Sequence, residues 1–555
     1  THLRDSSAVG SWQYAFRVRG IESIIHSVRG LLGTNEKVHV VLYDARNAFN
    51  AIRRQAISSV LMSDDRFHCL RALFNAFYAE QGDLIIRGEG EEHDVISSSE
   101  GVRQGDVLGP LFFCLALKPA VERALARYRA VMGDQPDEIL HVFAYMDDIT
   151  AAGTEKALEV FNGYLVHELS GLSLKINPTK TVTTSSHMQT LLGCERTDCV
   201  KLLGAFVSRN AEREKEFVDA IPAEHEKLFN RIPLLPAEVG FRVLSVCTVP
   251  RFAHVINTHA PEVSRPAAKV FTEMVARTLC AVLSVDYDAM SGQTFRQLRL
   301  PIRFGGLGLH DWEEKAERAY QASVNNERRR EREFDPNAPD GAQYERDDAE
   351  HEEMLEEIKA VDPAFHSHLE RQSTKMMSAW LTSPVTVASA QASNAFRGAM
   401  LFRLLWTGTD PNAIAQFHCK CGFPRKNASK TTTREMLLHM AGCAEGGGPT
   451  QRHHAVRDGL LSIMSRAGYT CLREEPLKGL MAGLSDAPNN DGTPEAPDPP
   501  DPQKKSKEGE LFMDIVATPH SGAPMYIDVT IANTASRSHA KKSDAKLFEE
   551  KDKEK

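Results

Sequence analysis

The sequence predicts a multidomain α+β protein, and three observations lead to that fold class. The chain has 555 residues, enough for about three or four domains of ordinary size. Hydrophobic residues make up 42% of the chain and charged residues 25%, as in globular proteins. Short apolar runs of strand length occur at 38–42, 140–144 and 200–206. They alternate with longer periodic stretches of helix length at 21–32 and 111–132.

Composition narrows the class of protein. Ten cysteines in this length do not indicate a disulfide scaffold and fit a reducing compartment. The longest apolar runs, such as 107–117, are shorter than the ~20 residues of a membrane span, so no membrane is expected. The formal net charge of −9 argues against a nucleic-acid binder, but much of the acidic surplus lies in 311–350 and leaves room for a basic groove elsewhere. Since the chain starts with Thr and no leader pattern follows, we expect a fragment whose N-terminal domains lie upstream.

Two acidic segments stand out from their apolar surroundings. HVFAYMDDITAAG, at 141–153, indicates a strand, a turn from Met146 to Asp148 and a second strand. On its own this is an ordinary acidic turn. However, VHVVLYDARNAFN, at 38–50, is a buried-strand run that ends in a further acid, Asp44. A strand end and a hairpin turn that meet would place carboxylates around two divalent ions ~3.5–4 Å apart, and hard oxygen ligands suit Mg²⁺.

The ordered motifs resemble the palm of a reverse transcriptase. The acidic segments supply D-x-x-x-A-F and Y-M-D-D. The other three motifs follow in the family's order, with GVRQGDVLGPLFF at 101–113, GLSLKINPTKT at 171–181 and VKLLGAFVS at 200–208. The last is similar to the primer-grip hairpin. The resemblance implies a right-hand polymerase of fingers, palm and thumb that uses two Mg²⁺ ions.

The resemblance also implies roles for single residues. Asp44 and Asp147 would be the metal ligands and Asp148 their supporting partner. Phe49 would exclude a ribose 2′-hydroxyl, whereas without the motif it would read as a core residue. Lys180 would be a general acid near the leaving pyrophosphate, whereas without the motif it is a solvated loop lysine. Gln104 and Gly105 would contact the template and the nucleotide. Arg17, in the segment QYAFRVRGIESII at 13–25, would contact phosphate.

A second cluster has the composition of a structural zinc site. It places Cys419-x-Cys421 seventeen residues before His439-x3-Cys443, and the i to i+4 spacing puts the last two on one helix face. Three thiolates and an imidazole form a closed tetrahedral set for Zn²⁺. Unrelated buried cysteines are the alternative.

A third cluster, ELFMDIVATPHSGAPMYIDVTIAN at 510–533, alternates as two strands joined by a Pro/Gly turn. Asp514 and Asp528 occupy related places in the two strands. A plain β-hairpin with the two acids on its solvent-exposed face is one interpretation. After a zinc knuckle, the pair resembles the restriction-like endonuclease of site-specific non-LTR retrotransposons, which implies a nuclease Mg²⁺ on these two acids and Glu474 as an outer carboxylate.

The nuclease segment departs from the family at two positions. The proline expected before the first acid is Met513, and the lysine expected two residues after the second acid is Thr530. A catalytic lysine must then come from the following segment, with Lys546 or Lys542 as candidates.

Together the resemblances predict the polymerase, zinc knuckle and small α/β nuclease of a non-LTR retrotransposon, similar to the spliced-leader-targeting clade. Expected partners are element RNA as template, target DNA as primer and dNTPs, in the nucleus, by target-primed reverse transcription. An intron-maturase-type enzyme and a decayed element that only binds RNA or DNA are the alternatives. The expected parts are fingers and palm at 1–208, thumb at 209–310, a charged helical linker at 311–415, the zinc knuckle at 416–456 and the nuclease at 457–555, with a disordered insert at 484–510.

Overall fold

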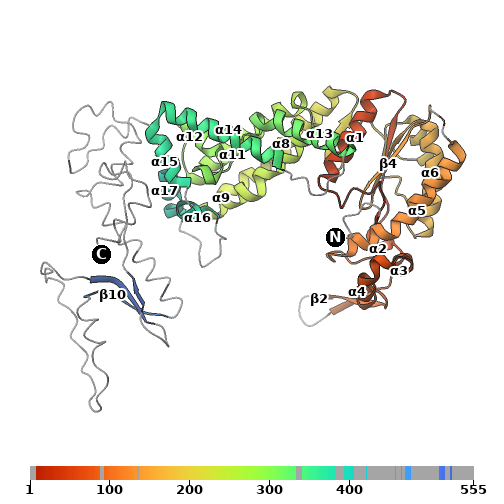
Figure 1. Cartoon of the computed structure of the whole chain (residues 1–555), viewed down its shortest axis with the longest axis horizontal. Helices are drawn as coiled ribbons and strands as arrows, with labels where there is room; N and C mark the ends of the chain where they lie inside the picture. Colours follow the sequence, from red (N-terminus) through yellow and green to blue (C-terminus); the bar gives the residue numbers. More distant parts are fainter. Residues whose placement is uncertain are drawn as a thin grey trace, which may run out of the picture. The chain divides into compact units, whose positions relative to one another are not determined.

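The structure, a computed structural model, falls into two compact units (Figure 1). Unit 1 comprises Thr1–Val282 and Gly308–Glu357, and unit 2 comprises Leu283–Leu307 and Ile358–Lys555. Within them the structure describes residues 8–87, 93–133, 135, 137–332, 341–373, 375–382, 393–405, 421, 457, 464, 469–476, 512–518 and 525–527.

Unit 1 is built on a five-stranded sheet in the order β4-β5-β1-β6-β7. Neighbouring strands are antiparallel except for β6 and β7, which are parallel. The apolar runs 38–42 and 140–144 form β1 and β4, as predicted. The strands are β1 (His39–Tyr43), β4 (Leu140–Tyr145), β5 (Asp148–Gly153), β6 (Val182–Thr183) and β7 (Glu195–Arg196).

Helices cover both faces of this sheet because its strands alternate buried side chains between the faces. Val41, Tyr43 and Ala151 pack in an apolar cluster with α5 (Gly109–Met132) and α6 (Glu155–Gly171). Val40 and Ala152 pack on the other side, in a cluster with α1 (Gly20–Thr34) and a separate hairpin of β8 (Cys199–Leu202) and β9 (Ala205–Ser208). The mixed helix and sheet fit the predicted α+β class.

The structure decides between two sequence expectations for residues 200–208, a strand and the primer-grip hairpin, in favour of the hairpin. The apolar run 200–206 reads as a strand, but the chain reverses inside it. Leu203 and Gly204 have φ values of 48° and 88°, and β8 and β9 pair antiparallel across them. Gly204 makes this tight reversal possible because it has no Cβ.

Smaller elements flank the sheet in unit 1. They are α2 (Ala48–Ala51), α3 (Arg54–Ser63), η2 (Asp65–Phe67), α4 (His68–Tyr78), the hairpin of β2 (Gly82–Arg87) and β3 (His93–Ser98), and α7 (Ser186–Leu192). Helices follow, as expected for residues 209–310: α8 (Ala211–Arg231), η3 (Ile232–Leu234), α9 (Ala237–Arg242), η4 (Val243–Thr248), η5 (Val249–Phe252), α10 (Ala253–Thr258) and α11 (Pro261–Leu283). The acid-rich segment gives α13 (Trp312–Arg332) and α14 (Gly341–Val361).

One helical stretch, Ala237–Thr258, is long and apolar enough to cross a membrane by length and composition. The sequence expectation of no membrane overlooked it. A core helix passes the same test, and 44% of the stretch is buried in the structure. Its buried side chains include Leu244, Phe252 and Ile256.

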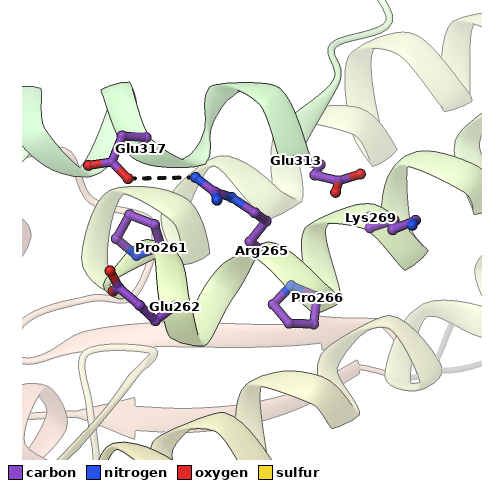
Figure 2. A pocket seen from close by; sticks show the side chains of 7 residues that line it. All are labelled: Pro261, Glu262, Arg265, Pro266, Lys269, Glu313 and Glu317. Carbon is purple, nitrogen blue, oxygen red and sulfur yellow. Dashed lines mark ion pairs between the residues drawn. The ribbon is translucent and has the colours of Figure 1, made fainter.

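A pocket of about 400 Å³ lies between α11 and α13, within unit 1 (Figure 2). Two prolines and five charged residues line it, and Arg265 forms an ion pair with Glu317 at 3.6 Å. None of the predicted site residues lines this pocket.

Unit 2 holds α12 (Gly292–Arg299), η6 (Ile302–Phe304), α15 (Pro363–Ser373), α16 (Lys375–Thr382), α17 (Ser393–Arg403) and a three-stranded antiparallel sheet of β10 (Thr470–Pro476), β11 (Phe512–Thr518) and β12 (Met525–Ile527). The pairing of β11 with β12 confirms the hairpin predicted for 510–533. The Gly305–Gly306 turn is tightly enclosed, because a Cβ on Gly306 would lie 1.9 Å from the Leu300 carbonyl oxygen. Arg403 donates a hydrogen bond to the Gly306 carbonyl at 3.0 Å, so this glycine turn is a packing element.

Candidate active site

The central sheet delivers the predicted acids to one end. Asp44 follows the last residue of β1, and β1 pairs with β5 so that Tyr43 faces Ile149. The register therefore brings Asp44 level with Asp148. β4 and β5 are joined by only two residues, Met146 and Asp147, because Tyr145 pairs directly with Asp148. The turn is one residue shorter than the sequence suggested, and Asp148 is the first residue of β5.

Hydrogen bonds from the loop after α6 fix Asp44. The main-chain N–H of Asn177 donates to the Asp44 carbonyl at 2.7 Å, and its side-chain Nδ2 donates to the Asp44 carboxylate at 3.2 Å. The N–H of Asp44 donates to the buried hydroxyl of Thr181 at 3.2 Å. The motif that carries Asn177 thus reaches Asp44 across 133 positions of sequence.

The electrostatics around the acids indicate shared negative charge. Displacement of water by the surrounding protein, with smaller effects from the charges of Asp147 and Asp44, raises the pKa of Asp148 to about 6, although the side chain keeps an exposed side. Burial, with a smaller effect of the Asp44 charge, raises the pKa of Asp147. Burial and the charge of Asp147 raise the pKa of the Cys114 thiol to about 12, which places this thiol on α5 close to Asp147. Carboxylates that oppose one another's ionisation form a favourable environment for a cation.

The carboxylate side chains at this end of the sheet have the chemistry that magnesium prefers. Within the described parts of the chain, no group of three or more His, Cys, Asp or Glu side chains is already drawn together as a metal site. The carboxylates of Asp44, Asp147 and Asp148 are nevertheless hard oxygen donors at one end of one sheet. Burial and, to a smaller extent, neighbouring carboxylates raise the pKa values of Asp147 and Asp148. Asp44 and Asp147 are the residues that would hold the ions.

Phe49 projects from the one-turn helix α2, which begins after Asn47 in the left-handed conformation with φ 47°. Its ring packs on Phe113 of α5, with centroids 4.8 Å apart. The backbone carbonyl of Phe49 accepts a hydrogen bond from Val102 at 2.7 Å. Phe49 is half-buried, so its ring has one supported side and one open side.

Gln104 and Gly105 lie in an exposed loop with a rigid base. Gly105 has φ +87° and open space around it. The base is fixed by Arg54, which is 9% exposed and donates to the carbonyls of Ser98, Glu100 and Gly101 at 2.9–3.2 Å. The sequence interpretation missed Arg54, because its partners lie about 45 positions further along the chain.

The positions of Lys180 and Arg17 do not by themselves indicate a particular role. Lys180 is exposed in the loop after Asn177. Arg17 stacks over the ring of Tyr14 at 4.1 Å and donates to the Ser11 carbonyl, so part of its guanidinium is already engaged. Their predicted roles toward pyrophosphate and phosphate stay predictions.

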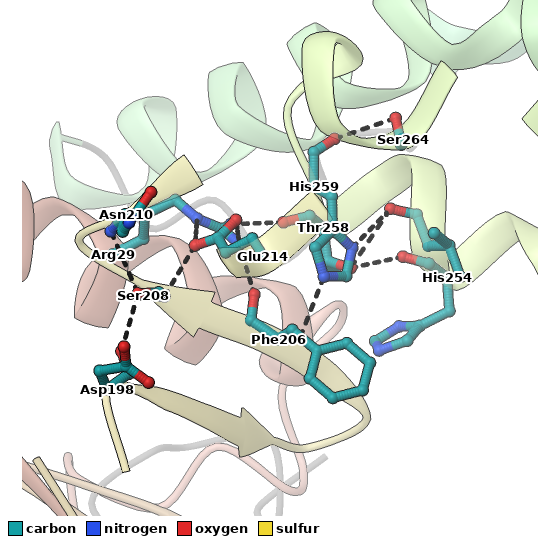
Figure 3. A network of polar contacts seen from close by, with 11 residues as sticks. Arg29, Asp198, Phe206, Ser208, Asn210, Glu214, His254, Thr258, His259 and Ser264 are labelled. Atoms are coloured by element: carbon teal, nitrogen blue, oxygen red, sulfur yellow. Dashed lines mark hydrogen bonds and ion pairs between the residues drawn. The ribbon is translucent and has the colours of Figure 1, made fainter. Parts of the chain in front are cut away.

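The β8–β9 hairpin is joined to the helices of unit 1 by a buried polar network (Figure 3). Arg29 of α1 donates to the carbonyls of Thr258 and Phe206 and pairs with Glu214 of α8 at 3.2 Å. The fully buried His259 accepts a hydrogen bond at Nε2 from the Phe206 N–H at 3.0 Å. This network fixes the predicted primer-grip hairpin against α8 and α10.

The other predicted sites lie largely outside the described residues. Of the zinc set only Cys421 is described, and it is half-buried. Cys419, His439 and Cys443 lie outside, as do Asp528, Lys542 and Lys546. Asp514 lies within β11 and Glu474 within β10.

Comparison with known proteins finds a family match and a relative. Residues 2–206 match the family described as reverse transcriptase (RNA-dependent DNA polymerase). The matched part contains Asp44, Asp147, Asp148 and the loops around them. A curated relative, the retrotransposable element SLACS 132 kDa protein of Trypanosoma brucei gambiense, is 26% identical over 310 residues, which are 55% of this chain. The chain spans about a quarter of the length of that relative, since the match covers 25% of it.

Solved structures give looser likenesses. Telomerase from Candida tropicalis in complex with a fragment of telomeric RNA is 11% identical, with a TM-score of 0.33 over 62% of this chain and 54% of that one. Apo telomerase from the same organism is also 11% identical, with a TM-score of 0.32 over 59% and 56%. TM-scores this low do not establish a shared fold.

Proposed function

We propose that this chain is the RNA-directed DNA polymerase of a non-LTR retrotransposon and extends a DNA primer on an RNA template. The single observation that carries the proposal is the β1–β5 register, which brings Asp44 level with Asp148 and leaves Asp147 in the adjoining turn. The match of residues 2–206 to the reverse transcriptase family and the retrotransposon relative support it.

The proposed reaction joins the primer 3′-hydroxyl oxygen to the α-phosphorus of a dNTP while the bond to pyrophosphate breaks, and the hydroxyl proton passes to water. Two magnesium ions, when bound, acidify that hydroxyl and neutralise charge on the pyrophosphate. Asp44 and Asp147 supply ligands and Asp148 adds negative charge beside them. Phe49 closes the pocket at the sugar 2′ position. Lys180 donates a proton to the leaving pyrophosphate.

Primer extension tests the proposal. The full chain is incubated with poly(rA)/oligo(dT), dTTP and Mg²⁺, beside Asp147→Ala and the control Asp137→Ala. Asp137 is an exposed acid in the loop before β4. We expect incorporation by the wild type and the control and a loss of at least about 10³-fold in Asp147→Ala, because a metal ligand is removed. Incorporation by the wild type no higher than by Asp147→Ala would overturn the proposal and favour a decayed element that only binds nucleic acid.

A restriction-like DNA-nicking nuclease is the second proposed activity, and the strand register favours it. Arg473 pairs with Ile515 and Glu475 with Met513, so Glu474 and Asp514 occupy facing positions on β10 and β11. Two acids level on neighbouring strands suit a Mg²⁺ site. Nicking of supercoiled plasmid by the chain, lost in Asp514→Ala, is the expected result. Equal nicking by both proteins would exclude this site.

The finer assignments rest on the sequence resemblance. We propose a structural Zn²⁺ on Cys419, Cys421, His439 and Cys443, target-primed reverse transcription in the nucleus, and membership of the spliced-leader-targeting clade. Metal analysis of the purified chain tests the zinc proposal. About one zinc per chain, absent from Cys419→Ser, is expected, and zinc that is absent or independent of this cysteine contradicts it.

A further inference from the structure

The turn that carries Asp147 has an unusual sequence for its shape. Only Met146 and Asp147 join β4 to β5, and Met146 has φ 56°, in the left-handed region. Two-residue hairpin turns with positive φ normally use Gly, Asn or Asp, because a Cβ disfavours that conformation. Interactions from outside the turn must therefore stabilise it.

Gln13 supplies those interactions from the segment before α1. Its side-chain oxygen accepts a hydrogen bond from the Met146 N–H at 2.9 Å, and its Nε2 donates to the Met146 carbonyl at 3.0 Å. The same oxygen accepts from the Ala15 N–H at 3.1 Å. Gln13 is 1% exposed, so water does not compete for these bonds.

The main chain around Gln13 fixes where the side chain starts. The Ala144 N–H donates to the Trp12 carbonyl at 2.7 Å, and the Tyr14 N–H donates to the Ala144 carbonyl at 2.8 Å. These bonds make the segment a short parallel extension at the outer edge of β4. The carboxamide then reaches past the end of β4 to the turn.

A carboxamide is suited to this place by its chemistry. It presents one acceptor and one donor to the N–H and C=O of the same residue. Glutamate, which has the same size, would lose the hydrogen bond donated to the Met146 carbonyl. Methionine, which has a similar length, would lose both hydrogen bonds to Met146. The sequence gives no local signal for this role, since Gln13 and Met146 are 133 positions apart.

We propose that Gln13 is a positioning residue that sets the Met146–Asp147 turn and so holds the Asp147 carboxylate where it can share metal ions with Asp44. This inference rests on the proposed polymerase function. A change at Gln13 then acts on the chemical step and on the Mg²⁺ requirement, and leaves the KM for dTTP nearly unchanged.

Steady-state primer extension with the full chain tests this inference, with melting temperature measured in parallel. Gln13→Met and the near-isosteric Gln13→Glu are compared with Gln297→Met. Gln297 is a matched control within unit 2, because it is also buried and its Nε2 donates to the carbonyls of Gly305 and Arg403 at 3.1 and 2.9 Å. We expect kcat to fall about 10- to 100-fold in both Gln13 variants, since misplacement of a reacting group by about 1 Å has effects of that size. The Mg²⁺ concentration for half-maximal rate should rise several-fold.

The outcomes separate the inference from the function it rests on. A wild type no more active than Asp147→Ala overturns the proposed function and the inference with it. An active wild type with an unchanged kcat per folded molecule in the Gln13 variants overturns the inference alone, whether or not the melting temperature falls. An equal loss of kcat in Gln297→Met overturns it as well, because the effect would then be general destabilisation. If Gln13→Met does not fold, the folded Gln13→Glu decides the question by the same criteria.

Discussion

His259 lies buried under the β8–β9 hairpin, and we predict that the attachment of this hairpin to the rest of unit 1 weakens at acid pH. Burial, with smaller effects of the Arg29 charge and of His254, lowers the pKa of His259 to about 3. The hydrogen bonds require the neutral ring, because Nε2 accepts from the Phe206 N–H while Nδ1 lies 3.0 Å from the Val255 carbonyl and donates to it. Protonation would add a hydrogen on Nε2 and abolish the bond from Phe206.

The sign and size of the effect follow from linkage. The pKa of this histidine is lower in the folded state than the 6.5 of the unfolded chain, so the unfolded state binds more protons at acid pH. The contribution to stability is fully present above pH 6.5 and is lost progressively as the pH falls toward 3. Between pH 7.5 and pH 5 the loss is about 2 kcal/mol, or roughly 30-fold in the opening equilibrium. A folded pKa anywhere below about 4 gives nearly the same figure, because pH 5 lies well above it.

Hydrogen exchange of the full chain measures this loss where it arises. Amides of β9 and α10 are compared at pH 7.5 and pH 5 after correction for intrinsic exchange rates. The wild type should lose about 30-fold protection, whereas His259→Gln, whose amide oxygen can still accept from Phe206, should lose little. His167→Gln, a change of an exposed histidine on α6, should behave as the wild type. An equal pH-dependent loss in the wild type and His259→Gln would refute the linkage argument. A uniform destabilisation by His259→Gln would not produce the expected result. Such an effect lowers amide protection equally at both pH values, whereas the measured quantity is the difference between them.

Three further predictions concern the residues around the site. Asn177→Leu should lower kcat in primer extension about tenfold by freeing the Asp44 carboxylate, and Asn177→Asp should lower it further, because a fourth acid would repel Asp44. Phe49→Val should reduce discrimination between dTTP and UTP at least about tenfold in single-nucleotide incorporation, and unchanged discrimination would mean that the ring on Phe113 is only a packing contact. Arg54→Met should lower the free energy of unfolding by about 2–4 kcal/mol in urea titration, since buried carbonyls lose their donor, and an unchanged urea midpoint would contradict this.

The sequence could predict the acids but not what positions them. Asp44 and Asp147 are visible because each ends an apolar strand run, a pattern that depends only on neighbours in sequence. Gln13, Arg54 and His259 are single polar residues whose partners lie 133, about 45 and 53 positions away. Such contacts exist only once the fold brings the segments together. The reversal inside 200–206 was expected only from the motif resemblance, since a Leu-Gly pair in an apolar run also fits a continuous strand.

The two adjacent acids can be given different roles from their surroundings. Burial and, to a smaller extent, the charge of Asp147 raise the pKa of Cys114 on α5, so Asp147 lies toward the first turns of that helix. Phe113, the residue before Cys114 on α5, packs against the ring of Phe49. Asp147 and the predicted sugar-excluding ring therefore both lie near the first turns of α5. Asp148 begins β5, level with Asp44, whereas Asp147 lies in the turn before it. We therefore expect Asp147 to be the metal ligand that works with Asp44, and Asp148 to be a neighbouring charge that strengthens the site for cations.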